Sequence, residues 1–226
     1  LRLPRLVAAA KHTLLDERLL RLYVADRRAT HDGCLWLNAA FAAAGFDLQV
    51  QAAGDGEREW RLMAGPEPGA LLRSVRPSGL VIHHEGERGA ERIVRAVDPR
   101  GTVLHYEGER DAERKVRVVD PRGTVIHYEG EQGAERVVRM AGPSGDVTHF
   151  EGERGAERVV RMDDPSGTVI HYEGERGAER VVRMVHPSGA VLHYEGERGA
   201  ERTVRIVQPN GRVTHFEGEQ GAERVL

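Results

Sequence analysis

Residues 171–189 read HYEGERGAERVVRMVHPSG, and close variants of this stretch fill most of the chain after residue 76. A Pro-x-Gly turn signal marks the copies and returns every 22 residues. Its prolines are Pro77, Pro99, Pro121, Pro143, Pro165, Pro187 and Pro209. Seven copies therefore occupy residues 77–226, the last of them cut short. This self-similarity predicts a repeat protein in which each copy is one supersecondary unit.

Each copy contains two short runs with the composition of β-strands. Residues 168–175 (TVIHYEGE) and 179–185 (ERVVRMV) are rich in β-branched and aromatic residues. Pro-Ser-Gly suits a three-residue hairpin loop with glycine at positive φ, and Glu-Arg-Gly-Ala supplies the reversal within a copy. The loop glycines are Gly101, Gly123, Gly145, Gly167, Gly189 and Gly211. We predict a mainly β protein, an antiparallel β-hairpin array, with a helix over the second run as the minority alternative.

Alternation along the predicted strands sorts the side chains onto two faces of the sheet. If residues 143–145 form the loop, Arg139 lies opposite His149 and Met140 lies opposite Thr148. One face is then apolar and includes Val138, whereas the other is polar and mixed. The apolar face carries the aromatic residues Tyr106, Tyr128, Phe150, Tyr172, Tyr194 and Phe216. Because 22 is an even number, every copy preserves these faces.

Composition limits the classes of function. Charged residues make up 31% of the chain and the formal charge is −3, so we expect no nucleic-acid partner. No apolar run approaches the about 18 residues of a membrane-spanning helix. The single cysteine, Cys34, excludes a disulfide within the chain and favours a reducing compartment. We therefore expect a cytoplasmic protein, and the opening LRLPRLVAAAKHTLL, without an initial methionine, is typical of a fragment rather than of a signal peptide.

The segment HYEGERGAERVV resembles the MORN repeat, whose core is a Tyr-Glu-Gly-Glu strand. The matching positions are 106–109, 128–131, 172–175 and 194–197, with phenylalanine replacing tyrosine in two other copies. Arg or Gln stands here where tryptophan usually follows, and Glu-Arg-x-Val replaces a later Gly-x-Gly. The resemblance implies a hairpin array that binds proteins and sometimes anionic lipids. Residues 118–131 are also similar to the YD repeats of Rhs-type shell proteins, which implies a shell fragment as an alternative.

The polar face carries a histidine and an arginine in each copy, and these form the candidate binding surface. They are His105, His127, His149, His171, His193 and His215, with Arg117, Arg139, Arg161, Arg183 and Arg205. Equivalent histidines lie two strands apart, about 9–10 Å, whereas two ligands of one zinc ion lie within about 4 Å of each other. We expect no metal and no cofactor, and charge pairs such as Glu129 with Arg139 or Glu151 with Arg161. The apolar face and the terminal edge strand predict self-association.

The N-terminal part of the chain differs in kind from the repeats. Residues 1–53 predict a small helical α/β region, with a helix over 3–28, an alanine-rich helix ending at Gly45, and a strand from FDLQVQ. Residues 54–76 are interpreted as a degenerate repeat or linker, because GDGEREWRLM retains the Gly-Glu-Arg of the copies.

The one reactive candidate is Cys34, which lies at or just before the second predicted helix. A helix N-terminus lowers the pKa of a thiol and activates it. The segment DGCLWLNAAF resembles the Asp-Gly-x-Cys element of OTU-type cysteine proteases but lacks the residue between glycine and cysteine. This implies an alternative hypothesis, a cysteine-hydrolase remnant with Asp32 nearby and His83 or His84 as the base. We favour a non-enzymatic scaffold, because a periodic array offers no singular catalytic constellation.

Overall fold

The computed structural model describes residues 46–52, 58–64, 70–76 and 78–226. The chain forms two compact units, Leu1–Pro121 and Arg122–Leu226. The strands of the first unit are β1 (Phe46–Ala52), β2 (Arg58–Ala64), β3 (Leu71–Val75), β4 (Val81–Glu85), β5 (Arg92–Val97), β6 (Val103–Glu107) and β7 (Arg114–Val119). Those of the second unit are β8 (Val125–Glu129), β9 (Arg136–Ala141), β10 (Val147–Glu151), β11 (Arg158–Asp163), β12 (Val169–Glu173), β13 (Arg180–Val185), β14 (Val191–Glu195), β15 (Arg202–Val207), β16 (Val213–Glu217) and β17 (Arg224–Val225).

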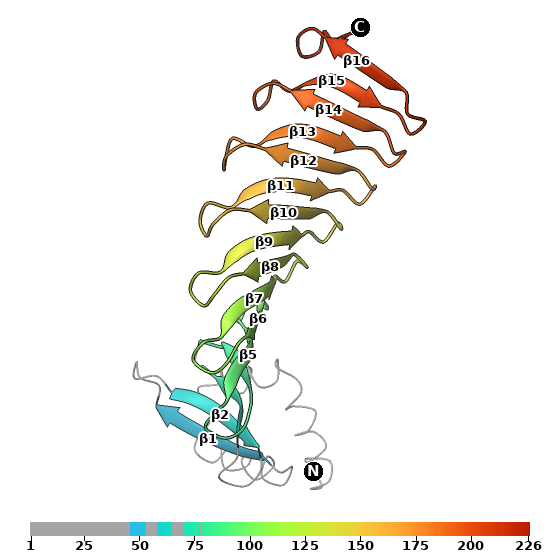
Figure 1. The fold of residues 1–226 in the computed structure, drawn as a ribbon. Helices are drawn as coiled ribbons and strands as arrows, with labels where there is room; N and C mark the ends of the chain where they lie inside the picture. The colour runs from blue at the N-terminus through green and yellow to red at the C-terminus, as the bar shows by residue number, and fades with distance from the viewer. Residues whose placement is uncertain (1–45, 53–57, 65–69, 77) are drawn as a thin grey trace, which may run out of the picture. The chain divides into compact units, whose positions relative to one another are not determined.

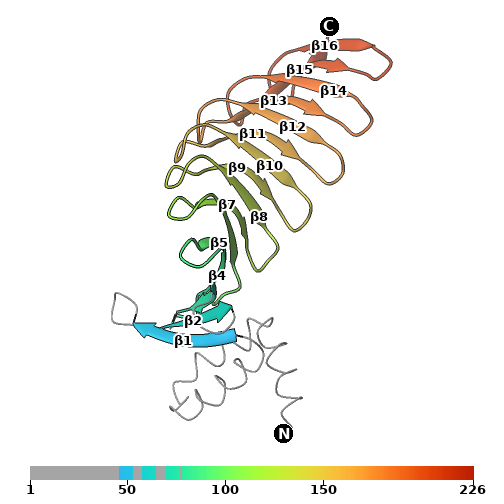
Figure 2. The same cartoon turned by 60° about the horizontal axis from the view of Figure 1, so that its bottom comes forward.

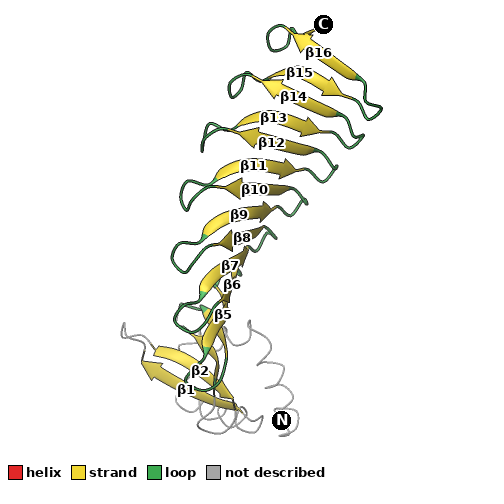
Figure 3. Cartoon of the chain, viewed as in Figure 1, coloured by secondary structure: helices red, strands yellow, loops and turns green. Residues whose placement is uncertain are grey.

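Within each unit, strands that are consecutive in the sequence pair antiparallel (Figure 1). Figure 2 shows the hairpins of the second unit following one another as a layer of strands. The regular elements in the described residues are all strands (Figure 3). These residues include no helical segment with the length and hydropathy needed to cross a bilayer. The predicted mainly β hairpin array is therefore confirmed.

The structure describes some of the elements predicted for the N-terminal part of the chain, whereas others lie outside the described residues. The two helices, over 3–28 and before Gly45, lie outside the described residues. The strand expected from FDLQVQ is present as β1, which pairs with β2. The interval 54–76 contains β2 and β3, and β3 pairs with β4 in the register of the later copies, with Arg73 opposite His83.

The turns have the predicted geometry. The N–H of Gly142 donates to the carbonyl of Asp146 at 2.8 Å, and the N–H of Gly145 donates to the carbonyl of Gly142 at 3.1 Å. All six loop glycines named above have positive φ, between 83° and 95°. At the other end of the hairpins, the N–H of Ala178 donates to the carbonyl of Glu175 at 2.9 Å. Pro-x-Gly and Glu-x-Gly-Ala therefore define the two ends of the repeat hairpins, with Asp111 in the glycine position of one copy at a φ of 64°.

A β-bulge in each hairpin changes part of the predicted face assignment. In β8 and β9, His127 lies opposite Arg139 but Tyr128 lies opposite Val137, so the register shifts by one residue. Strict alternation from Arg139 predicts that Val137 lies on the polar face, and this prediction is wrong, because Val137 pairs with Tyr128 of the apolar face. The extra residue arises because β9 has six residues and β8 has five. A bulge accommodates this difference without moving the turns.

Deep burial is concentrated in the first unit. The side chains of Val75, Val81 and Val97 are 1%, 0% and 3% exposed, and they occupy paired positions on one face of β3, β4 and β5. Ile82 and Ala96, 7% and 5% exposed, pair on the opposite face of the same strands. Most strand residues of the second unit are half-buried.

Candidate functional site

Three parallel rows of side chains form the polar face of the second unit, because each row takes one position from each of the strands β8 to β16. The valine row consists of Val125, Ala141, Val147, Asp163, Val169, Val185, Val191, Val207 and Val213. The His–Arg row consists of His127, Arg139, His149, Arg161, His171, Arg183, His193, Arg205 and His215. The Glu–Arg row pairs Glu129 with Arg136, Glu151 with Arg158, Glu173 with Arg180, Glu195 with Arg202 and Glu217 with Arg224.

Histidines and arginines alternate strictly along the His–Arg row. His171 lies opposite Arg161 of β11 on one side and opposite Arg183 of β13 on the other. Nη1 of Arg183 is 3.4 Å from Nε2 of His171. The first unit contains a row of the same kind, formed by Arg73, His83, Arg95, His105 and Arg117. The sequence-predicted binding residues thus lie in one continuous row within each unit.

The environment of the row disfavours protonated histidine. Burial and the neighbouring charges of Arg183 and Arg161 lower the pKa of His171, with Asp163 acting in the opposite direction. Burial, together with Arg205 and Arg183, lowers the pKa of His193 in the same way. These histidines are therefore neutral at pH 7, while the arginines between them keep their charge.

Asp163 breaks the periodicity of the polar face. It occupies a position of the valine row that holds alanine or valine at Ala141 and Val185. Its Oδ1 accepts a hydrogen bond from Nε of Arg161 at 2.6 Å, and its Oδ2 lies 3.2 Å from Nε2 of His149. Although desolvation opposes them, these contacts lower the pKa of Asp163. Arg161 is consequently the one arginine of the row that a carboxylate neutralises within the described second unit.

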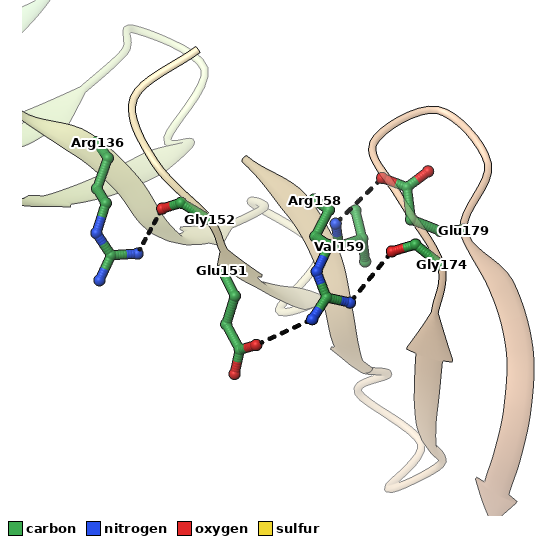
Figure 4. Close-up of polar contacts among 7 residues, drawn as sticks. All are labelled: Arg136, Glu151, Gly152, Arg158, Val159, Gly174 and Glu179. Atoms are coloured by element: carbon green, nitrogen blue, oxygen red, sulfur yellow. Dashed lines mark hydrogen bonds and ion pairs between the residues drawn. The ribbon is translucent and has the colours of Figure 1, made fainter. Parts of the chain in front are cut away.

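The Glu–Arg row joins each hairpin to the next one (Figure 4). Nη2 of Arg158 donates to Oε2 of Glu151 at 3.3 Å within its own hairpin. Nη1 of the same guanidinium donates to the carbonyl of Gly174, in the following copy, at 3.3 Å. Arg136 reaches the carbonyl of Gly152 in the equivalent way, at 3.2 Å. The arginine that opens each second strand is therefore a tie between copies.

The predicted charge pairs used the wrong arginines. Glu129 pairs with Arg136 at 3.4 Å rather than with Arg139, and Glu151 pairs with Arg158 at 3.3 Å rather than with Arg161. The bulge is the physical reason, because it brings the first arginine of the second strand opposite the glutamate. Arg139 is left in the His–Arg row, where its neighbours are histidines.

A second glutamate in each copy satisfies backbone amides where strand pairing between copies stops. Pairing of β11 with β12 extends only from Asp163 to Arg161, so the N–H of Val159 lies beyond it. Oε1 of Glu179 accepts that N–H at 3.3 Å (Figure 4). Its Oε2 accepts the N–H of Gly177 at 2.9 Å. The N–H of Glu179 itself, followed by these two amides, lowers the pKa of Glu179 against a desolvation contribution. Sequence reasoning missed these contacts, although the invariant spacing of the Gly-Ala-Glu-Arg stretch was their signal.

The aromatic residues lie on the opposite, apolar face. Tyr172 lies opposite Val181, and Tyr194 lies opposite Thr203. The hydroxyl of Tyr194 points to the sulfur of Met184, 3.9 Å away. Burial, followed by the charge of Glu201, raises the pKa of the Tyr172 phenol. These rings are half-buried within a layer of aliphatic side chains.

The alternative catalytic residues are not brought together in what the structure describes. Cys34 and Asp32 lie outside the described residues. His84 lies in β4 opposite Ile93, with its Nε2 3.2 Å from Oγ of Ser74. The described residues contain no cluster of three or more histidine, cysteine, aspartate or glutamate side chains arranged to hold a metal ion.

Comparisons with known proteins give no family. No protein-family model matches the sequence, and no curated protein matches it. One solved structure that is similar is the crystal structure of TcdB2-TccC3-Cdc42, at 9% identity and a TM-score of 0.18. The match covers 77% of this chain and 14% of that chain, so this chain spans a small part of that protein's length. The assignment to a MORN-type repeat stays a prediction.

Proposed function

We propose that the chain is a non-enzymatic repeat scaffold that binds a protein partner along its β-hairpin array. The observation that carries this proposal is the continuity of the three rows across the second unit. Such a surface repeats one chemical environment every second strand, so it suits an extended partner better than a small substrate. A catalytic centre needs one constellation that differs from its surroundings.

The ties between copies support a structural role for most of the polar side chains. Arg158 and Glu179 each form a hydrogen bond with a backbone group of a neighbouring copy. Groups held in this way are poorly placed to transfer protons to a bound substrate. The resemblance to MORN repeats, which mostly serve as scaffolds for proteins and sometimes anionic lipids, supports the same proposal.

Site-specific photo-crosslinking in an extract of the source cells tests this function. A photoreactive amino acid is placed on the apolar face at Tyr172, on the polar face at Arg183, or in the exposed loop at Ser188 as the control. We expect one face to yield a discrete crosslinked protein that the loop position does not yield. No crosslink from either face, or the same products from Ser188, would contradict a scaffold function.

A further inference from the structure

The geometry points to the kind of partner that the polar face takes. We propose that the His–Arg row of the second unit is the docking line for an extended acidic polypeptide segment with a carboxylate at every third residue. This inference rests on the proposed function and deepens it, because it names the binding face and the chemistry of the partner.

The charge of the row is the first argument. In the described second unit, Arg139, Arg183 and Arg205 form no ion pair with a carboxylate, unlike the arginines of the Glu–Arg row. Between Arg161 and Arg205, His171 and His193 add polar ring nitrogens and little charge at neutral pH, because burial and the neighbouring arginines lower their pKa. The row therefore presents single guanidinium groups separated by histidines, and guanidinium groups bind carboxylates in a bidentate manner.

The spacing of the row is the second argument. Equivalent arginines lie two strands apart, which is about 9.4–9.8 Å. A polyproline II segment has three residues per turn and rises about 3.1 Å per residue, so every third side chain recurs on one side at about 9.3 Å. A β-strand repeats at about 6.6–6.8 Å on one side and does not match the arginines. An α-helix is about 10–12 Å across and would also cover the glutamates of the neighbouring row.

The third argument comes from the Glu–Arg row and the valine row, which flank the His–Arg row and favour a single anionic chain over a broad anionic surface. The side chains of Glu129, Glu151 and Glu195 are 64%, 64% and 65% exposed on the same face. Each of these carboxylates is already paired with an arginine, so the Glu–Arg row offers no net positive charge to a broad anionic surface such as a membrane, whereas a single chain can follow the unpaired guanidinium groups of the His–Arg row. On the other side, the valine row offers apolar contact to the residues between the acidic positions.

Asp163 supplies an internal test of the proposal. It neutralises Arg161 and so removes one cation from the line. Val185 occupies the equivalent position in the valine row. Replacing Asp163 with valine frees the guanidinium of Arg161, so the row regains an unpaired arginine at that position. The proposal therefore predicts that Asp163→Val improves binding, although it removes a native ion pair.

The experiment measures binding of two fluorescent peptides to the full chain by anisotropy. Both peptides are rich in proline and valine and carry six glutamates; one has glutamate at every third residue, and the other has the same glutamates at every second residue. We expect the first peptide to bind more tightly. The double variant Arg183→Gln/Arg205→Gln should weaken this binding about fivefold, and Asp163→Val should strengthen it about threefold. The matched control Arg212→Gln, at an exposed turn, should leave it unchanged.

Several outcomes would overturn the inference. They are equal binding of the two peptides, no effect of the double variant, no binding of either peptide, and tighter binding of inorganic polyphosphate or phosphatidylserine vesicles than of the first peptide. Circular dichroism and thermal unfolding establish that each variant is folded. If the peptides fail while Tyr172 still crosslinks a protein, the inference fails and the scaffold function stands; if both fail, the function falls with it.

Discussion

The strands β3–β5 of the first unit and β13–β15 of the second unit have the same register and different environments. Val75, Val81 and Val97 are at most 3% exposed, whereas Val185, Val191 and Val207 at the equivalent positions are half-buried. Farther along the second unit, Val213 is 41% exposed. The motif itself thus determines strands, turns and pairing, while the surroundings of each copy determine how deeply its side chains are buried.

The largest expected loss of stability comes from replacing a loop glycine that the hairpins of both units require. A Cβ added at Gly86 would lie 2.7 Å from the carbonyl oxygen of Ala90, and one added at Gly174 would lie 2.5 Å from that of Ala178. Both glycines also have φ above 110°. Gly86→Ala and Gly174→Ala should each destabilise their hairpin by about 3 kcal/mol, through strain and steric overlap. Hydrogen exchange of the two hairpins measures this.

The control for the glycine prediction is Gly177, which also has a positive φ but open space around its Cβ position. Gly177→Ala should cost less than Gly174→Ala. Equal costs would show that strain alone, without the steric contact, accounts for the loss. A loss confined to one unit would contradict a shared local requirement.

The second prediction concerns the difference in side-chain burial between the two units. Val81→Ala should destabilise the first unit by about 2 kcal/mol, because the side chain is fully buried. Val191→Ala should cost about 1 kcal/mol or less, because its side chain is half-buried. Urea unfolding followed by hydrogen exchange reports both values, and equal losses would refute the environmental difference.

The third prediction concerns pH. Folding lowers the pKa of His105, His171 and His193 below the ordinary value of 6.5, so the unfolded chain binds more protons in this window. Stability should therefore be constant above that value and fall as the pH drops through it. His193→Gln should reduce the fall, measured as the midpoint of urea unfolding between pH 8 and pH 5. An unchanged pH profile would contradict it.

The smallest expected effect comes from a tie between copies. Glu179→Gln exchanges a carboxylate oxygen at the amide of Val159 or Gly177 for an amide group. We expect faster exchange of the Val159 amide with little change in global stability. Glu175→Gln, in the exposed loop of the same copy, is the matched control. The first unit offers the same test in Glu91, whose Oε1 accepts the N–H of Leu71 at 3.0 Å.

The sequence predicted what depends on local chemistry and periodicity. Proline and glycine placed the turn at 143–145, and this turn set Arg139 opposite His149. The bulge at Val138 was missed because it depends on the unequal lengths of two strands. The contact of Glu179 with Val159 was missed because a side chain there replaces a strand partner. The depth of burial at Val81 was beyond prediction, because no property of its own copy determines it.

The ties between copies have a genetic consequence. The contacts of Arg158 and Glu179 reach only into an adjacent copy, over 16 and 20 residues. Unequal recombination that gains or loses one complete copy leaves an identical set of contacts on both sides of the junction. An insertion or deletion that is not a whole number of copies shifts the glutamate away from its amide and moves side chains out of their rows. The contacts between copies are therefore compatible with arrays that differ by whole copies, and they require one fixed phase of the repeat.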